Sequence, residues 1–135
     1  IVLITNSSML VEPRARREIA GVDVIIPSLD AVSQDVFEKI DRPAPGISVK
    51  KVIEALIRLR KEFSGKVWLE VMLVRDGNDS VAYLKKIKKV VDRIKPDRVQ
   101  INAPVRAPVE KWVRPPTAAT LKKAKKIFGK NCDII

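Results

Sequence analysis

The sequence predicts an α/β fold in which about four parallel strands alternate with flanking helices. Short aliphatic and β-branched runs recur along the chain, and between them lie longer stretches whose apolar residues return every three or four positions. A repeated order of strand, helix and strand is typical of a parallel sheet with right-handed crossovers.

Four runs are expected to form the strands, at residues 1–5, 22–28, 67–74 and 98–102. Each carries aliphatic or β-branched residues at consecutive positions, which is typical of strands that are covered on both faces. The apolar runs are far shorter than the roughly 18 residues that a membrane span needs, so we expect no membrane contact.

Five stretches between and after the strands are expected to be helices. Their starts carry residues that favour the first turn, namely proline at residue 13 and a hydroxyl-bearing N-cap at Ser48 and Thr117. Gly129 is expected to end the last one. The expected helices span residues 13–20, 33–40, 49–63, 78–94 and 117–128.

The length predicts one domain, residues 1–135, that forms half of a barrel. A closed barrel of eight strand–helix units needs about 250 residues, whereas this chain has 135 residues and about four expected strands. We therefore expect a partial (half) TIM-like barrel. Because residues 1–5 would leave an unpaired strand edge, we also expect the chain to be a piece of a longer protein.

The composition excludes several kinds of active site. The chain has 27 Lys and Arg against 16 Asp and Glu, a formal net charge of +11, no His and one Cys, Cys132. Without His it can hold neither a Ser–His–Asp triad nor a His-ligated zinc ion. One Cys allows no disulfide framework and no cysteine-ligated iron–sulfur cluster held by this chain alone. The sequence also contains no phosphate-binding G-x-x-x-x-G-K-[ST] loop.

The composition also bears on source and location. A charged fraction of 32% with few thermolabile residues favours a heat-adapted organism. The scarcity of Cys and the lack of a signal-peptide pattern favour a cytoplasmic location.

Polar residues gather where the expected strands end. Ligands of α/β sheets and barrels bind at the carboxyl ends of the strands, so these residues are expected to line a site for a polar small molecule. The residues after the first two strands are Thr5, Asn6, Ser7, Ser28 and Asp30, and those after the other two include Asn78, Asn102 and Arg106.

Simpler roles stay open for several of these residues. Asn78 and its two neighbours also suit a helix cap, and Asp30 could form an ion pair with Arg42. Glu70 lies inside an apolar run, so it is expected either to face a barrel lumen or to pair with a Lys at a strand edge.

Four segments resemble, in order, the radical S-adenosylmethionine (radical SAM) superfamily. The resemblance is to the iron–sulfur oxidoreductases akin to the wyosine-synthesis enzyme, which modifies transfer RNA. It runs from residue 1 to about residue 120. The segments are LITNSSML at 3–10, PSLDA with VFEKIDRP at 27–43, EVMLV with GNDS at 70–80, and VQIN with VRAP at 99–108.

The resemblance implies that a complete protein would hold a [4Fe–4S] cluster and cleave S-adenosylmethionine to a 5′-deoxyadenosyl radical. The CxxxCxxC segment of the superfamily is absent from this sequence, and Cys132 cannot replace three ligands. The chain alone is therefore expected to be inactive and to bind no cluster. Carried over, the cofactor side is Thr5, Asn6, Ser7, Ser28 and Asp30, and the substrate or lumen side is Glu70, Asn78, Gln100, Asn102 and Arg106.

Two alternatives stay open beside this reading. Lysine pairs at residues 85–89 and 122–126 could form a nucleic-acid-binding surface, although a solvated helix face explains each pair as well. The exposed edge of residues 1–5 could instead pair two copies into a homodimer with a structural or ligand-binding role.

Overall fold

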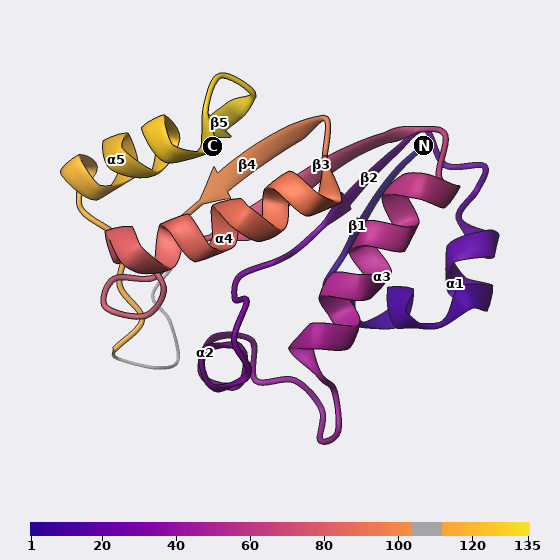
Figure 1. Cartoon of the computed structure of the whole chain (residues 1–135), viewed down its shortest axis with the longest axis horizontal. Helices are drawn as coiled ribbons and strands as arrows, with labels where there is room; N and C mark the ends of the chain where they lie inside the picture. Colours follow the sequence, from indigo (N-terminus) through magenta and orange to yellow (C-terminus); the bar gives the residue numbers. More distant parts are fainter. Residues whose placement is uncertain (104–111) are drawn as a thin grey trace.

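The computed structural model describes residues 1–103 and 112–135 and shows an α/β fold (Figure 1). The helices and strands follow one another along the chain largely as the sequence predicts. The strands are β1 (Val2–Thr5), β2 (Val24–Pro27), β3 (Lys66–Met72), β4 (Arg98–Asn102) and β5 (Cys132–Ile134). The helices are the 3₁₀ turn η1 (Ser8–Val11), α1 (Pro13–Glu18), α2 (Gln34–Asp41), α3 (Val49–Glu62), α4 (Val81–Ile94) and α5 (Ala118–Phe128).

The five strands form one parallel sheet in the order β1-β2-β3-β4-β5. Each strand is thus the sheet neighbour of the next strand in the sequence, which is the order of a barrel wall. The predicted α/β class and the parallel strands are confirmed. All strand ends of one polarity therefore lie at one edge of the sheet, where the polar residues were expected.

In the part of the chain that the structure describes, helices cover one face of the sheet, which corrects the expectation of strands buried on both faces. Along β3 and β4 buried side chains alternate with half-buried or exposed ones. The buried set includes Leu69 and Ile101, which pack into the core beneath the helices. Figure 1 shows α3, α4 and α5 following one another along one side of the strands.

The other side of the sheet is here named the open face. Its side chains are the alternate residues of each strand, and none of the described helices buries them. It is apolar along β1 and β2, and most of its side chains on β3, β4 and β5 are polar or charged. The open face comprises Val2, Ile4, Val24, Ile26, Ser28, Lys66, Trp68, Glu70, Met72, Arg98, Gln100, Asn102 and Asp133.

The fifth strand, β5, was not predicted from the sequence. It has three residues and pairs in parallel with β4, with Val99 opposite Cys132. Its sequence carries no long aliphatic run, so it can be recognised as a strand only from its pairing with β4. The buried free thiol of Cys132 packs into the core there.

Three helix starts carry the predicted hydroxyl caps, whereas Ser33, also expected to be a cap, forms no side-chain cap hydrogen bond at the start of α2. The side chains of Ser48, Ser80 and Thr117 each accept a hydrogen bond from the backbone N–H three residues later. The role of Ser80 as a cap is therefore confirmed. Among the described residues, no helix is long and apolar enough to cross a membrane.

Candidate functional site at the carboxyl ends of the strands

The turn after β1 is built by two of the predicted cofactor residues. Ser7 is fully buried, has a positive φ of 78°, and its hydroxyl donates to the Ser28 carbonyl at 2.6 Å. Thr5 Oγ1 accepts from the Ser7 N–H at 3.2 Å. The Ser7 hydroxyl thus joins the end of β1 to the end of β2, while the Thr5 hydroxyl holds the turn itself, so both shape the site without lining its cavity.

Asn6 and Ser28 do face an open space at this edge. Asn6 is exposed, and its Oδ1 accepts from the N–H and the hydroxyl of Ser8 at 3.1 and 2.9 Å, which fixes the amide in the turn. The Ser28 hydroxyl has no recorded partner within the described part of the chain. Ser28 therefore offers a hydroxyl that can bind a ligand.

The carboxyl group of Asp30 is buried, with 7% of the residue exposed. Its Oδ1 accepts from the Met72 N–H at 2.7 Å, and it is hydrogen-bonded to the carboxyl group of Asp41 on α2. Burial, together with the hydrogen bond and charge of Asp41, raises the pKa of Asp30 well above its usual range. The groups that act on this carboxyl are therefore Asp41, Met72 and, more weakly, Glu70.

A cavity of about 320 Å³ lies between these turns and α2. It brings together three of the five predicted cofactor residues, Asn6, Ser28 and Asp30, with apolar side chains and an Arg. Hydroxyl, amide and carboxyl groups above an apolar wall suit a polar ligand with an aromatic or aliphatic part. The remaining lining residues are Ser8, Phe37, Asp41, Arg42, Pro43, Ala44 and Ile47.

A row of polar side chains crosses the open face beside this cavity. The strand register places Ser28 next to Glu70, Glu70 opposite Gln100, and Gln100 opposite Asp133. These four residues are here named the polar row. Because neighbouring parallel strands lie about 4.8 Å apart, the polar row offers four adjacent hydrogen-bonding side chains.

Glu70 lies on the open face, between Ser28 and Gln100. Its Oε1 accepts from Asn102 Nδ2 at 3.1 Å, and the described residues include no Lys that pairs with it. The carboxylate is half-buried and not enclosed in the core. Glu70, Gln100 and Asn102 thus lie together on the surface that would face a barrel lumen.

Asn78 takes another position. Its side chain is fully buried, and all of its amide hydrogen bonds go to backbone groups. Oδ1 accepts from the Val74 N–H at 2.8 Å, while Nδ2 donates to the carbonyls of Asp30 and Met72 at 2.7 and 2.8 Å. Asn78 therefore ties the ends of β2 and β3 together and does not face the open face.

The fourth strand end is only partly described. Arg106, the last predicted lumen residue, lies outside the described residues. The segment from Trp112 onward is held to α2 and to the β3 end, because Lys39 lies 4.7 Å from the centroid of the Trp112 ring and Arg75 Nε donates to the Pro115 carbonyl at 2.9 Å.

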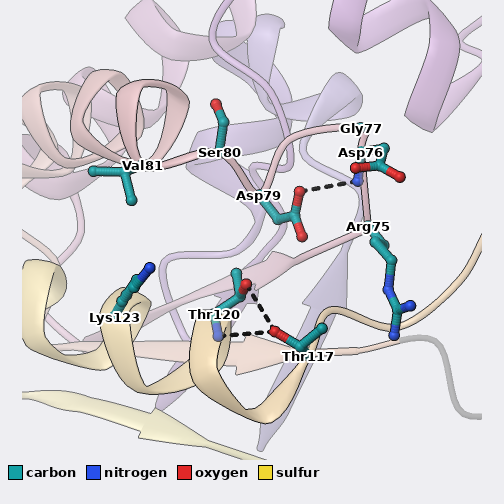
Figure 2. Close-up of a pocket in the computed structure, with 9 residues that line it drawn as sticks. All are labelled: Arg75, Asp76, Gly77, Asp79, Ser80, Val81, Thr117, Thr120 and Lys123. Atoms are coloured by element: carbon teal, nitrogen blue, oxygen red, sulfur yellow. Dashed lines mark hydrogen bonds between the residues drawn. The ribbon is translucent and has the colours of Figure 1, made fainter.

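A second hollow, of about 610 Å³, lies between the amino ends of α4 and α5 (Figure 2). Its acidic and hydroxyl groups bond to nearby groups. Asp79 accepts from the Asp76 N–H at 2.9 Å, and the hydroxyls of Thr117 and Thr120 lie 3.0 Å apart. The sequence did not single out this hollow, because Thr117 and Thr120 lie far from residues 75–81 along the chain.

Within residues 1–103 and 112–135 no group of three or more acidic or Cys side chains is arranged to hold a metal ion. The carboxyl pair of Asp30 and Asp41 has Glu70 as its acidic neighbour on the open face. The described site is therefore one of hydroxyls, amides and carboxyls.

No model of a known protein family matches the chain. Among curated proteins, "GTPase Obg" of Brachyspira hyodysenteriae is 40% identical over 134 residues, which are 99% of this chain and 20% of that protein. A UPF0026 protein of Methanocaldococcus jannaschii is 27% identical over 97% of this chain and 42% of its own length. The chain thus spans between a fifth and about two fifths of these two relatives.

Two solved structures share the fold. A domain of pyruvate-formate lyase-activating enzyme from Bacteroides vulgatus matches with a TM-score of 0.76 at 10% identity, over 98% of this chain and 79% of that one. A radical SAM methyltransferase from Sphaerobacter thermophilus matches with a TM-score of 0.77 at 20% identity, over 100% of this chain and 40% of that one. The chain therefore has the fold of a partial barrel of the kind that these enzymes contain.

Proposed function

We propose that this chain is the cofactor- and substrate-facing half of the barrel of a radical SAM enzyme. The observation that carries the proposal is the polar row, because it lies on the open face of a sheet whose fold is shared with such enzymes. In a barrel the open face is the lumen, and ligands bind at the carboxyl ends of its strands. Within the superfamily, the four sequence segments favour the iron–sulfur oxidoreductases akin to the wyosine-synthesis enzyme.

The residues present do not fit an iron–sulfur cluster. Such clusters take several Cys thiolates, whereas this chain has one Cys, whose thiol is buried in β5. Burial raises the pKa of the Cys132 thiol to about 11, which disfavours the thiolate that binds iron. We therefore propose that this chain alone is inactive and that another part of a complete enzyme supplies the cluster ligands.

The residues do fit S-adenosylmethionine, which when bound supplies the carbon radical chemistry of the superfamily. Ser28 and Asn6 would bind hydroxyl groups of the cofactor in the cavity, and the apolar wall at Phe37 and Ile47 would exclude water. Glu70 and Asn102 would orient a substrate on the open face through their mutual hydrogen bond. Asp30 would position the end of β3 and helix α2, through its hydrogen bonds with the Met72 N–H and with Asp41.

Titration calorimetry with S-adenosylmethionine tests the cavity directly. We expect measurable binding to the chain and at least about a tenfold loss in Ser28→Ala, since a lost ligand hydrogen bond costs about 1.4 kcal/mol. The matched control is Ser64→Ala, because Ser64 is exposed at the amino end of β3. Equal affinity of all three proteins, or no binding by any of them, would contradict the assignment of the cavity.

The name of the first relative does not extend to this chain. The match covers a fifth of the protein named GTPase Obg, and the present sequence has no G-x-x-x-x-G-K-[ST] loop. A GTPase activity of this chain is not part of the proposal.

A second candidate function, binding of nucleic acid, rests on the charge of α4 and α5. These two helices carry nine Lys and Arg residues and one acidic residue, Asp92. Asp92 pairs with Lys88, and Lys125 donates to the Cys132 carbonyl. The other seven basic side chains of α4 and α5 form no ion pair within the described residues: Lys85, Lys86, Lys89, Arg93, Lys122, Lys123 and Lys126.

The salt dependence of RNA binding tests this second candidate. Contacts with phosphates release counterions, so affinity should fall steeply as salt rises. We expect Lys85→Glu with Lys89→Glu to weaken binding more than Lys50→Glu with Lys61→Glu on α3. Failure to bind structured RNA at low salt would exclude it.

A third candidate, a homodimer through β1, has the exposed edge in its favour. Ile1, Val2 and Ile4 are 82%, 57% and 70% exposed. An apolar strand edge of this kind pairs readily with another strand. Light scattering across a dilution series measures the association, and a monomer at every concentration would contradict a homodimer.

A further inference from the structure

The short helix α2 is held at both of its ends, by α4 at its start and by the residues that follow β2 at its other end. At its start, the Tyr83 hydroxyl on α4 accepts from the N–H groups of Val32 and Ser33 at 2.9 and 3.2 Å and lies 2.8 Å from Ser33 Oγ. At its other end, the Asp41 carboxyl is hydrogen-bonded to Asp30. The second attachment is a contact between two acids.

A hydrogen bond between two carboxyl groups needs one proton between them. When both groups are ionised, neither can donate, and two like charges remain at hydrogen-bond distance. The Met72 N–H stabilises one charge on Asp30, while Glu70 on β3 opposes it. Arg42 lines the same cavity, and Asn6, Ser8 and Ser28 on the facing turns are uncharged.

We propose that Asp30 and Asp41 share one proton and form a pH-sensitive latch that holds the end of α2 over the carboxyl-end cavity. With the proton in place, α2 is fixed to the end of β2 and the cavity keeps its wall of Phe37, Asp41 and Ile47. After loss of the proton, repulsion releases the end of α2 and opens the cavity. The latch depends only on this chain and does not require a bound cofactor.

The sign of the pH dependence follows from the direction of the shifts. Burial is the largest cause that raises the pKa of both Asp30 and Asp41 above the ordinary value of 3.8. The folded chain therefore holds the shared proton at a pH where the unfolded chain has lost it. The contribution of the pair to stability is full below about pH 3.8 and is lost as pH rises through the raised value.

Trp112 is a built-in reporter for this movement, because Lys39 of α2 lies 4.7 Å from its ring centroid. In a Trp68→Phe background Trp112 is the one remaining Trp of the chain. We expect its fluorescence to change in a single transition with a midpoint above pH 3.8. Asp41→Asn should abolish the transition, since an amide donates to the Asp30 carboxylate without a titrating proton.

Asp35→Asn is the matched control, because Asp35 is exposed on the same helix. It should keep the transition and its midpoint. An unchanged transition in Asp41→Asn, or none in the background protein, would overturn the latch.

Carboxyl NMR of the unsubstituted chain keeps the proposal testable if Asp41→Asn does not fold. Two Asp signals should titrate together above the ordinary range. Ordinary, independent titration of all Asp carboxyls would overturn the proposal.

Discussion

Asn78 shows at the residue scale how one side chain can organise a site that it does not face. Its amide satisfies one N–H and two carbonyls from the ends of β2 and β3. Buried backbone groups without a partner cost free energy. The positions of Asp30 and Met72, and through them the shape of the cavity, therefore depend on this amide.

Replacement of Asn78 by Ala should lower the free energy of unfolding by about 2–4 kcal/mol, because three buried backbone groups lose their partner. Urea unfolding measures the change. Asn131→Ala, at an exposed Asn in the loop before β5, should change it by less than about 0.5 kcal/mol. Equal effects of the two substitutions would contradict the positioning role.

Cys132 permits a chemical test of the unpredicted strand β5. Burial raises the pKa of its thiol from 9.0 to about 11, so the folded chain holds on the order of 100-fold less thiolate at mildly alkaline pH. We expect slow labelling by a disulfide reagent in buffer and rapid labelling in denaturing urea. Rapid labelling of the folded chain would show that β5 does not cover the thiol.

At the scale of elements, the connection before β4 fastens a helix to two strands. Asp97 Oδ2 accepts from Arg60 Nη1 of α3 at 2.6 Å and from the Val67 N–H of β3 at 2.8 Å. Arg60 also donates to the carbonyls of Phe63 and Gly65 at 2.9 Å each. This network holds the amino ends of β3 and β4 against the end of α3, opposite the candidate site.

Asp97→Asn should destabilise the fold by about 1 kcal/mol, since the ion pair is partly exposed. Although burial raises the pKa of Asp97, the Val67 N–H and Arg60 lower it below 3.8 overall. The unsubstituted chain should therefore keep this contribution above about pH 3.8 and lose it as pH falls through the lowered value. Urea unfolding at several pH values should show the difference between the two proteins narrowing in acid.

At the scale of the whole molecule, the sheet exposes apolar area along β1 on the face that the described helices leave open. Val2 and Ile4 are exposed on this side, while the helices cover the opposite face. Apolar patches of this kind mark surfaces that bind other protein. The proposed barrel half is consistent with such a surface, because the open face would become a lumen.

Ile4→Lys should reduce self-association without loss of stability. Ile4 is 70% exposed, so little buried area is lost, and a charged residue on an edge strand opposes strand pairing. Sedimentation velocity at several concentrations measures association, and thermal unfolding provides the control. Undiminished association would place the contact elsewhere on the molecule.

Local signals explain which parts of the fold could be predicted. Caps such as Ser48 and Thr117 act on the N–H groups of the next turn, and apolar rows face the nearest sheet. The carboxyl-end location of Asn6, Ser28 and Asp30 followed from the direction of parallel strands, and the cavity contains all three. Their roles as ligands stay predictions, as do those of Glu70 and Asn102.

Contacts distant in sequence explain what could not be predicted. The Asp30 carboxyl accepts from the Met72 N–H, which lies 42 residues further along the chain on β3. The short β5 exists because β4 supplies its hydrogen bonds.

The sequence by itself determined the alternation of strands and helices, the parallel direction and the edge at which polar residues gather, because these depend on periodicity and chain order. The tertiary structure alone decided which face of the sheet stays open, that two acids meet at the end of α2, and that Asn78 is enclosed. These outcomes depend on how separate elements pack, and packing brings together groups whose spacing along the chain carries no signal of their contact.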